Sequence, residues 1–203
     1  MVARHISSVA SLVGNISGER PECGVDEAGC GPAFGPVVAA ALILPEGWGD
    51  PRLDDSKRVS ERNREALFAR ITAEAVAWSV AQVPAAEIDR INILQARLLA
   101  MRLALDGLTV RPSHVVVDGD RFLAGYAVPH TCLVGGDGIS AAVAAASIVA
   151  KKTRDDIVRA MSAEYDRWGL ERNKGYLTRE HAELINRHGL SDQHRRTFCK
   201  RFI

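Results

Sequence analysis

Residues 23–44, CGVDEAGCGPAFGPVVAAALIL, contain the pattern that decides the fold. Two apolar runs, 23–25 and 37–44, are short and continuous, which is typical of strands buried on both faces. The segment between them, 26–36, is rich in Gly and Pro and therefore reads as a turn. The stretch predicts a hairpin-like pair of buried strands at the start of a sheet.

The rest of the chain alternates helical and strand patterns. Ser60 is a predicted N-cap for a helix over about 61–75, and Gly107 ends a helical pair that begins after Pro84. Further strands are predicted at 77–83, 114–117 and 132–134, and further helices over 140–162 and 179–188. This order predicts an α/β protein in which helices flank a mixed sheet.

The charge of the chain is balanced overall but unevenly distributed. Its 203 residues include 26 Lys and Arg against 25 Asp and Glu, a net charge of +1. Charged residues make up 25% and hydrophobic residues 47%, which excludes disordered, collagen-like and coiled-coil proteins. Residues 151–203 carry net +5 and the first 150 residues carry net −4. An acidic body beside a basic quarter suits a carboxylate-rich site next to a phosphate-binding surface.

The cysteine pattern and the hydropathy both favour a cytoplasmic protein. No CxxC pair occurs among the four cysteines, so we expect free thiols in a reducing compartment. No apolar run approaches the roughly 20 residues that span a bilayer, so we expect no membrane association. Residues 1–20 are interrupted by Ser, Gly and Asn, and this predicts a poorly ordered or helical leader rather than a secretory signal.

Acidic side chains stand where three of the predicted strands end. Asp26 and Glu27 follow the first strand, Asp118 ends another, and Asp137 follows the short strand at 132–134. Because strand ends can meet at one edge of an α/β sheet, we expect these acids to converge. Oxygen ligands without supporting His or Cys favour hard cations such as Mg²⁺ or Mn²⁺. Each acid also has a simpler interpretation as a turn residue, and spacing alone leaves both interpretations open.

Seven motifs, in order along the chain, resemble those of the ribonuclease HII family. They are GVDEAG (24–29), DDSK (54–57), INILQA (91–96), VVVDG (115–119), AAASIVAK (144–151), KGY (174–176) and HRRTF (194–198). The resemblance implies an RNase H-like fold, with a five-stranded mixed sheet flanked by helices. It also implies that residues 21–203 form one catalytic domain, with a helical C-terminal lobe from about residue 155.

The activity that the resemblance implies is endonucleolytic. Such an enzyme cuts RNA in RNA/DNA hybrids and at ribonucleotides embedded in duplex DNA. Cleavage falls on the 5′ side of the ribonucleotide and leaves 3′-OH and 5′-phosphate ends. The expected partners are therefore RNA/DNA hybrids and duplex DNA containing ribonucleotides, and the chain is expected to act as a monomer.

The resemblance also assigns catalytic residues. It implies a two-metal site for Mg²⁺ or Mn²⁺, whose catalytic, metal-binding carboxylates are Asp26, Glu27, Asp118 and Asp137. The last of these follows the short strand and precedes the Ala-rich helix, as the fourth acid of the family does. Asp155 is a rival for that place, although its position inside the helix favours an ion pair with Lys151 at i−4.

Substrate contacts follow from the same resemblance. The turn Gly29-Cys30-Gly31 supplies backbone groups close to the 2′-hydroxyl of the ribonucleotide, and its glycines permit the approach. Tyr176 stacks under the sugar at the RNA–DNA junction, with a core tyrosine as the simpler interpretation. The other candidate contacts, each of which also has an ordinary structural explanation, are Ser56, Lys57, Asn92, Ser147, Lys151 and Lys174.

Three positions near the predicted site lack the basic residues usual in the family. They are Cys30, Gly135 and Ile139. A protein with fewer cations facing the phosphates binds nucleic acid more weakly and with a smaller dependence on salt. Because the carboxylate set is complete, we expect chemistry to be retained with altered affinity. The alternative is a protein that binds RNA/DNA hybrids but cleaves them weakly or not at all.

Overall fold

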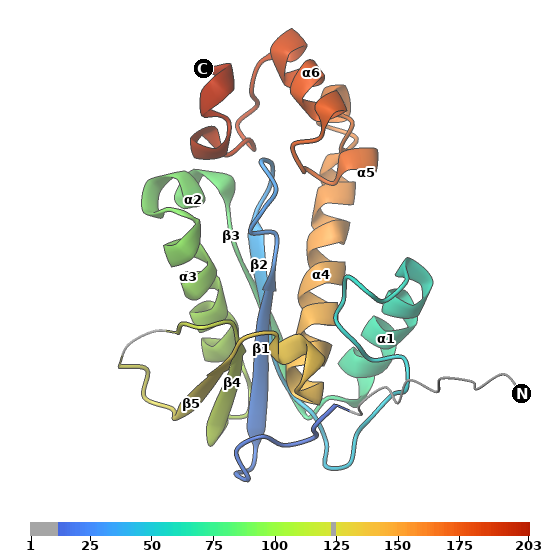
Figure 1. Ribbon diagram of the computed structural model, residues 1–203, viewed down its shortest axis with the longest axis vertical. Helices are drawn as coiled ribbons and strands as arrows, with labels where there is room; N and C mark the ends of the chain where they lie inside the picture. The colour runs from blue at the N-terminus through green and yellow to red at the C-terminus, as the bar shows by residue number, and fades with distance from the viewer. Residues whose placement is uncertain (1–11, 123–124) are drawn as a thin grey trace, which may run out of the picture.

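The computed structural model describes residues 12–122 and 125–203 (Figure 1). Its main elements, in chain order, are β1 (Glu22–Ala28), β2 (Val37–Ile43), α1 (Glu61–Glu74), β3 (Ala77–Val83), α2 (Ala85–Ile91), α3 (Ile93–Asp106), β4 (His114–Asp118), β5 (His130–Leu133), α4 (Ala141–Met161), α5 (Leu170–Asn173) and α6 (Arg179–His188). Short 3₁₀ turns lie between β5 and α4, before α5 and at the C-terminus.

The five strands form one mixed sheet in the order β3-β2-β1-β4-β5. β1 pairs antiparallel with β2 and parallel with β4, β2 pairs antiparallel with β3, and β4 pairs parallel with β5. All seven residues of β2 are buried, which explains its continuous apolar sequence. The predicted α/β class and mixed five-stranded sheet are therefore confirmed.

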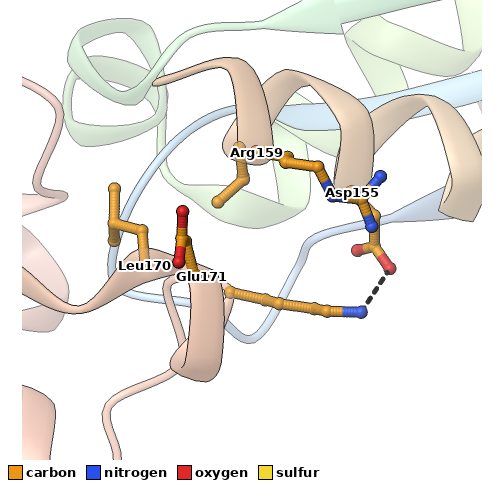
Figure 2. Close-up of a pocket in the computed structure, with 6 residues that line it drawn as sticks. Asp155, Arg159, Leu170 and Glu171 are labelled. Atoms are coloured by element: carbon orange, nitrogen blue, oxygen red, sulfur yellow. Dashed lines mark hydrogen bonds and ion pairs between the residues drawn. The ribbon is translucent and has the colours of Figure 1, made fainter. Parts of the chain in front are cut away.

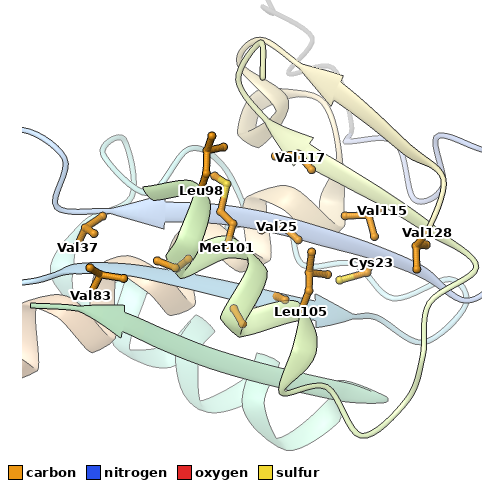
Figure 3. Packing of buried hydrophobic residues seen from close by; sticks show 14 of the residues in the cluster. Cys23, Val25, Val37, Val83, Leu98, Met101, Leu105, Val115, Val117 and Val128 are labelled. Carbon is orange, nitrogen blue, oxygen red and sulfur yellow. The ribbon is translucent and has the colours of Figure 1, made fainter. Parts of the chain in front are cut away.

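Helices cover both faces of this sheet (Figure 1). On one face, Cys23 and Val25 of β1 pack with Met101 and Leu105 of α3 (Figure 3). On the other face lies α4, with α1 packed against it. Strand side chains alternate between the two faces, so consecutive residues of β1 meet different helices.

The Ala-rich sequence of α4 lets it approach β1 closely. A Cβ atom at Gly24 would lie 2.2 Å from the carbonyl carbon of Ala142, so the strand backbone touches the helix where it has no side chain. The first turns of α4, including Ala144 and Ala145, are fully buried. This tight contact fixes the start of α4, and with it the turn that carries Asp137, against the sheet.

Residues 193–195, near the C-terminus, form backbone hydrogen bonds with the loop between β1 and β2. The Arg195 amide donates to the Ala33 carbonyl at 2.7 Å, and the Gly35 amide donates to the Gln193 carbonyl at 2.9 Å. Figure 1 shows α5, α6 and the C-terminus beyond the end of the sheet where this loop lies. The basic quarter of the chain therefore borders the turn at residues 29–31.

The bounds of β1 and β5 differ from the sequence expectation. β1 continues through Asp26 and Glu27, which pair with Ala40 and Ala39 of β2, so these acids lie within a strand rather than in the turn. β5 begins two residues earlier than predicted and ends before Val134, whose side chain is 76% exposed. Both differences arise from pairing partners far away in the sequence.

Residues 12–20 lie against the body of the protein and form no helix. The Val13 amide donates to the Ile139 carbonyl at 2.8 Å, and the Val13 carbonyl accepts from the Ala141 amide at 3.0 Å. The Glu22 carboxylate accepts from the amides of two residues in this segment. The disorder or helix expected for the first eleven residues lies outside the described part of the chain.

The structure also describes the state of the cysteines and the hydropathy of the helices. All four cysteines, at positions within the described ranges, are free thiols. No helix in residues 12–122 or 125–203 is both long and apolar enough to cross a membrane.

Candidate active site

Asp26 and Asp118 lie at neighbouring positions on adjacent parallel strands. The register pairs Val25 with Val117, so each aspartate is the next residue on its own strand. Val25 and Val117 belong to the core on the α3 face, and alternation therefore directs both aspartates to the α4 face. Asp26 is 5% exposed. Glu27, one residue further, points to the α3 face.

A turn between β5 and α4 adds Asp137. The Gly136 amide donates to Oδ1 of Asp118 at 2.8 Å, which ties this turn to the end of β4. Ser140 caps α4 with its side chain directly after the turn. Asp137 is 9% exposed and lies beside Asp55, a carboxylate of the DDSK motif that the sequence analysis did not single out.

The four acids carry negative charge that the protein leaves largely uncompensated. Burial raises the pKa of Asp26 well above its usual range, and the charges of Glu27, Asp118 and Asp137 raise it further. Burial also raises the pKa of Glu27, against the lowering effect of Arg97. The pKa of Asp137 is raised by burial first and then by the charges of Asp55 and Asp118. Such mutual repulsion is typical of a site built for cations.

The donor atoms of this site fit a divalent metal ion. Oε2 of Glu27 is buried without a hydrogen-bond partner, although buried carboxylate oxygens normally have one. The set contains only oxygen donors, which suits Mg²⁺ or Mn²⁺ rather than zinc. Within the described residues, no three His, Cys, Asp or Glu side chains already stand at metal-ligand spacing. The fit therefore rests on donor chemistry and charge.

The raised pKa values make a prediction for the metal-free protein. An acid whose pKa is raised by folding stabilises the fold below its ordinary pKa, near 3.8 for Asp26, and loses that contribution as the pH rises through the folded value. We expect Asp26→Asn to be more thermostable than wild type at pH 8, and this advantage to shrink towards pH 4. Thermal unfolding in EDTA, followed by circular dichroism, measures the difference. A difference that is independent of pH would contradict the assigned electrostatics.

A cavity of about 230 Å³ opens beside these acids. Its lining unites three of the acids with most of the predicted substrate contacts: Asp26, Glu27, Ala28, Gly29, Cys30, Gly31, Ser56, Lys57, Asp118, Ser147, Lys151 and Tyr176. Tyr176 faces the turn, since a Cβ atom at Gly31 would lie 3.6 Å from its ring. The structure thus brings the carboxylates, the Gly-Cys-Gly turn and the tyrosine to one place.

Three predicted residues do not line this cavity: Asp137, Asn92 and Lys174. Asn92 is the N-cap of α3 and accepts a hydrogen bond from the Gln95 amide at 3.1 Å. Two lining residues also have structural partners, because the hydroxyl of Ser147 donates to that of Ser56 at 2.7 Å. That bond ties the DDSK segment to α4.

Comparison with known proteins identifies the family. The sequence matches the Ribonuclease HII family over residues 23–201. The chain belongs to the ribonuclease HII family. It is 48% identical to the ribonuclease HII of Parabacteroides distasonis over 88% of this chain and 90% of that protein. It is 51% identical to that of Moorella thermoacetica over 86% of this chain and 84% of that protein.

Solved structures agree on the fold. The ribonuclease H2 of Pyrococcus horikoshii superimposes with a TM-score of 0.71 and 26% identity, over 89% of this chain and 98% of that chain. The protein therefore has the RNase H-like fold and is a type 2 ribonuclease H, as the resemblance of its motifs implied.

Asp155, the rival fourth acid, is neutralised by lysines on both sides. Lys151 Nζ lies 2.6 Å from its Oδ1, and Lys174 Nζ lies 3.3 Å from its Oδ2. Burial alone would raise the pKa of Asp155, but these two lysines together lower it. Asp155 and Lys174 line a separate cavity of about 250 Å³ with Arg159, Leu170 and Glu171 (Figure 2). Asp155 therefore forms the ion pair with Lys151 that its helical position predicts.

Two buried arginines that the sequence analysis missed support the turn. Arg195 is 0% exposed, and its guanidinium donates to the carbonyls of Gly29 at 2.7 Å, Cys30 at 3.3 Å and Gly35 at 2.9 Å. Arg154 donates to the Lys174 carbonyl at 2.9 Å and so joins α4 to the KGY motif. Arg195 lies in the HRRTF motif, but the sequence assigns this role to neither arginine. The carbonyl partners of Arg195 lie at least 160 residues away, and the Lys174 carbonyl lies 20 residues from Arg154.

A pair of buried histidines holds the backbone of Tyr176. The Ser191 amide donates to Nδ1 of His194 at 2.9 Å, so the proton of that ring is on Nε2. Nε2 of His194 then donates to Nε2 of His181 at 3.1 Å, and Nδ1 of His181 donates to the Tyr176 carbonyl at 3.0 Å. Burial lowers the pKa of His194 to about 4, so the pair stays neutral near pH 7.

Proposed function

We propose that this type 2 ribonuclease H is a metal-dependent endonuclease acting on RNA/DNA hybrids and on ribonucleotides embedded in duplex DNA. It cuts on the 5′ side of the ribonucleotide and leaves 3′-OH and 5′-phosphate ends. The observation that carries the proposal is the set of mutually repelling carboxylates, which includes a buried Glu27 oxygen without a partner. Residues 21–203 act as one catalytic domain.

The proposed ligands of two Mg²⁺ or Mn²⁺ ions are Asp26, Glu27, Asp118 and Asp137. Ions held by these residues would supply activation of a water and stabilisation of the leaving oxygen in an in-line displacement. The protein positions the oxygens: β1 and β4 hold Asp26 and Asp118 side by side, and the Gly136 hydrogen bond orients Asp118.

Substrate recognition rests on the turn and the tyrosine. The backbone of the Gly-Cys-Gly turn borders the cavity, and Arg195 and Arg154 brace it from the protein side. Tyr176 is 45% exposed, so its ring is available to stack against a sugar at the RNA–DNA junction. The hydrogen bond from His181 to the Tyr176 carbonyl holds the backbone of this residue, and this fixes the point from which its side chain extends.

The decisive assay compares duplex DNA containing one ribonucleotide with an RNA/DNA hybrid, each in Mg²⁺ and in Mn²⁺. We expect cleavage of both, with 5′-phosphate on the downstream product. Absence of cleavage at enzyme excess, with binding retained, would favour the alternative of a protein that binds hybrids without cutting them. The loss of activity would then follow from the absence of basic residues at positions 30, 135 and 139, which are Cys30, Gly135 and Ile139. Absence of both binding and cleavage would refute both functions.

Asp137→Asn and Asp155→Asn separate the two candidates for the fourth ligand. We expect the first to lower the cleavage rate about a hundred-fold or more, because an uncompensated carboxylate is removed from the metal site. The second should change the rate less than about three-fold, because Asp155 is already paired with two lysines. Single-turnover rates on the hybrid in Mg²⁺ test this. The reverse ranking would transfer the ligand role to Asp155.

A further inference from the structure

Arg97 of α3 pairs with one of the proposed metal ligands. Its Nε lies 3.6 Å from Oε1 of Glu27. Within residues 12–122 and 125–203, this is the only ion pair that any of the four proposed ligands forms. Both side chains are largely buried, at 22% exposed for Arg97 and 12% for Glu27. The proposed metal site therefore contains a cation of its own.

The fold places Arg97 there for a simple reason. Glu27 continues the row of Cys23 and Val25, the β1 residues that face α3. The guanidinium also lies against the backbone that follows Asp118, since a Cβ atom at Gly119 would be 2.8 Å from its Nη2. Gly119 has a φ of +102°, which favours glycine at this position. Arg97 thus lies beside the ends of both β1 and β4.

The pairing is electrostatic and leaves hydrogen-bonding capacity unused. A distance of 3.6 Å is longer than an N–H···O hydrogen bond. Both the Nε of Arg97 and the Oε2 of Glu27 are buried atoms without a hydrogen-bond partner. Unpaired buried donors and acceptors are unfavourable, and both groups would gain by exchanging this contact for closer ones.

The turn on the other side of Glu27 carries no cation. Cys30 occupies its centre, and the thiol donates a weak hydrogen bond to Oε1 of Glu27 at 3.4 Å. The same oxygen is thus approached by a thiol from the turn and by a guanidinium from α3. Among the residues that the structure describes, Arg97 is the cation that pairs with this oxygen.

We infer that Arg97 is an exchangeable cation of the active site, which pairs with Glu27 in the metal-free protein and binds a phosphate of the nucleic acid once a divalent ion takes that carboxylate. This inference rests on the proposed function. A guanidinium offers five N–H donors in a planar fork, which matches a phosphate better than a single carboxylate oxygen at 3.6 Å. Metal binding and substrate binding are thereby linked through one side chain.

The first test measures metal affinity without nucleic acid. Isothermal titration of Mn²⁺ into Arg97→Met should give binding about ten-fold tighter than to wild type, because a positive charge beside the ligand oxygen is removed. Arg97→Lys should bind Mn²⁺ as wild type does. Arg102→Met is the matched control, since Arg102 lies on the same helix, is 59% exposed and pairs with Asp106. Unchanged Mn²⁺ affinity in Arg97→Met would overturn the inference.

The second test measures the salt dependence of binding to a short RNA/DNA hybrid. In Ca²⁺, a hard cation that takes carboxylate oxygens, Arg97→Met should reduce the slope of log K against log salt by about one unit. In EDTA, where Arg97 stays with Glu27, the slopes of the two proteins should agree. Equal slopes in Ca²⁺ would overturn the phosphate contact. A wild-type protein that binds no hybrid would refute the proposed function, while the Mn²⁺ titration still decides the pairing with Glu27.

Discussion

Asp26→Asn should lower the rate of cleavage roughly a thousand-fold, a loss of about 4 kcal/mol of transition-state stabilisation. Asparagine keeps the shape of the side chain. Its side-chain oxygen can still accept the hydrogen bond that the Glu27 amide donates to Oδ1 of Asp26 at 2.7 Å. The substitution removes the charge that lies beside Asp118 at the centre of the acidic group. Single-turnover cleavage of the hybrid in Mg²⁺, with enzyme in excess, isolates this chemical effect from product release.

Asp50→Asn is the matched control for this variant. The Asp50 side chain is also almost fully buried, but Arg52 and Arg70 hold it at 2.6 and 2.8 Å. Hydrogen bonds from Arg52 keep the pKa of Asp50 well below its usual range, so its charge stabilises the fold. We therefore expect Asp50→Asn to lose stability and keep activity, the opposite of Asp26→Asn. A rate for Asp26→Asn within ten-fold of wild type would contradict its assignment as a ligand.

The sheet could be predicted because its signals are local. The strand at 77–83 and the cap at Ser60 follow from short patterns of apolar and polar residues, and the structure has them at those positions. The extension of β1 through two acids was not predictable in this way. Charged residues are unfavourable in buried strands. The strand extends through Asp26 and Glu27 because they pair with Ala40 and Ala39 of β2.

The site could be predicted only in part, for a related reason. Three of the four acids and Tyr176 lie in motifs that can be read from short stretches of sequence, and the same three acids line one cavity with that tyrosine. Arg97 has no such signal, because one arginine among apolar residues of an amphipathic helix normally reaches solvent. Its partner Glu27 is seventy positions away, and only the alternation of β1 relative to α3 brings the two together.

Arg195→Met should be the most destabilising single substitution near the turn, at about 3 kcal/mol or more in the free energy of unfolding. The Arg195 guanidinium is fully buried. It donates to three backbone carbonyls in the loop between β1 and β2 and, within the described residues, to no carboxylate. Burial lowers the pKa of Arg195 to about 10, so the side chain remains charged near neutral pH. Methionine fills the space of the stem but leaves those carbonyls buried without donors. Urea unfolding of the two proteins in the absence of metal gives the difference directly.

Arg196→Met is the control, because the neighbouring side chain is exposed and only its backbone amide, bonded to Asp89, contacts the body. It should unfold as wild type does. Equal stability of the two variants would mean that the carbonyls of Gly29 and Cys30 find other donors, and that the turn needs no support from the C-terminal segment. If Arg195→Met is instead destabilised as expected, the turn proposed to bind the ribose is held by a residue more than 160 positions further along the chain. Below its unfolding temperature, the variant should then lose discrimination between a ribonucleotide and a deoxyribonucleotide before it loses the carboxylate chemistry, since β1 and β4 position the acids independently of Arg195.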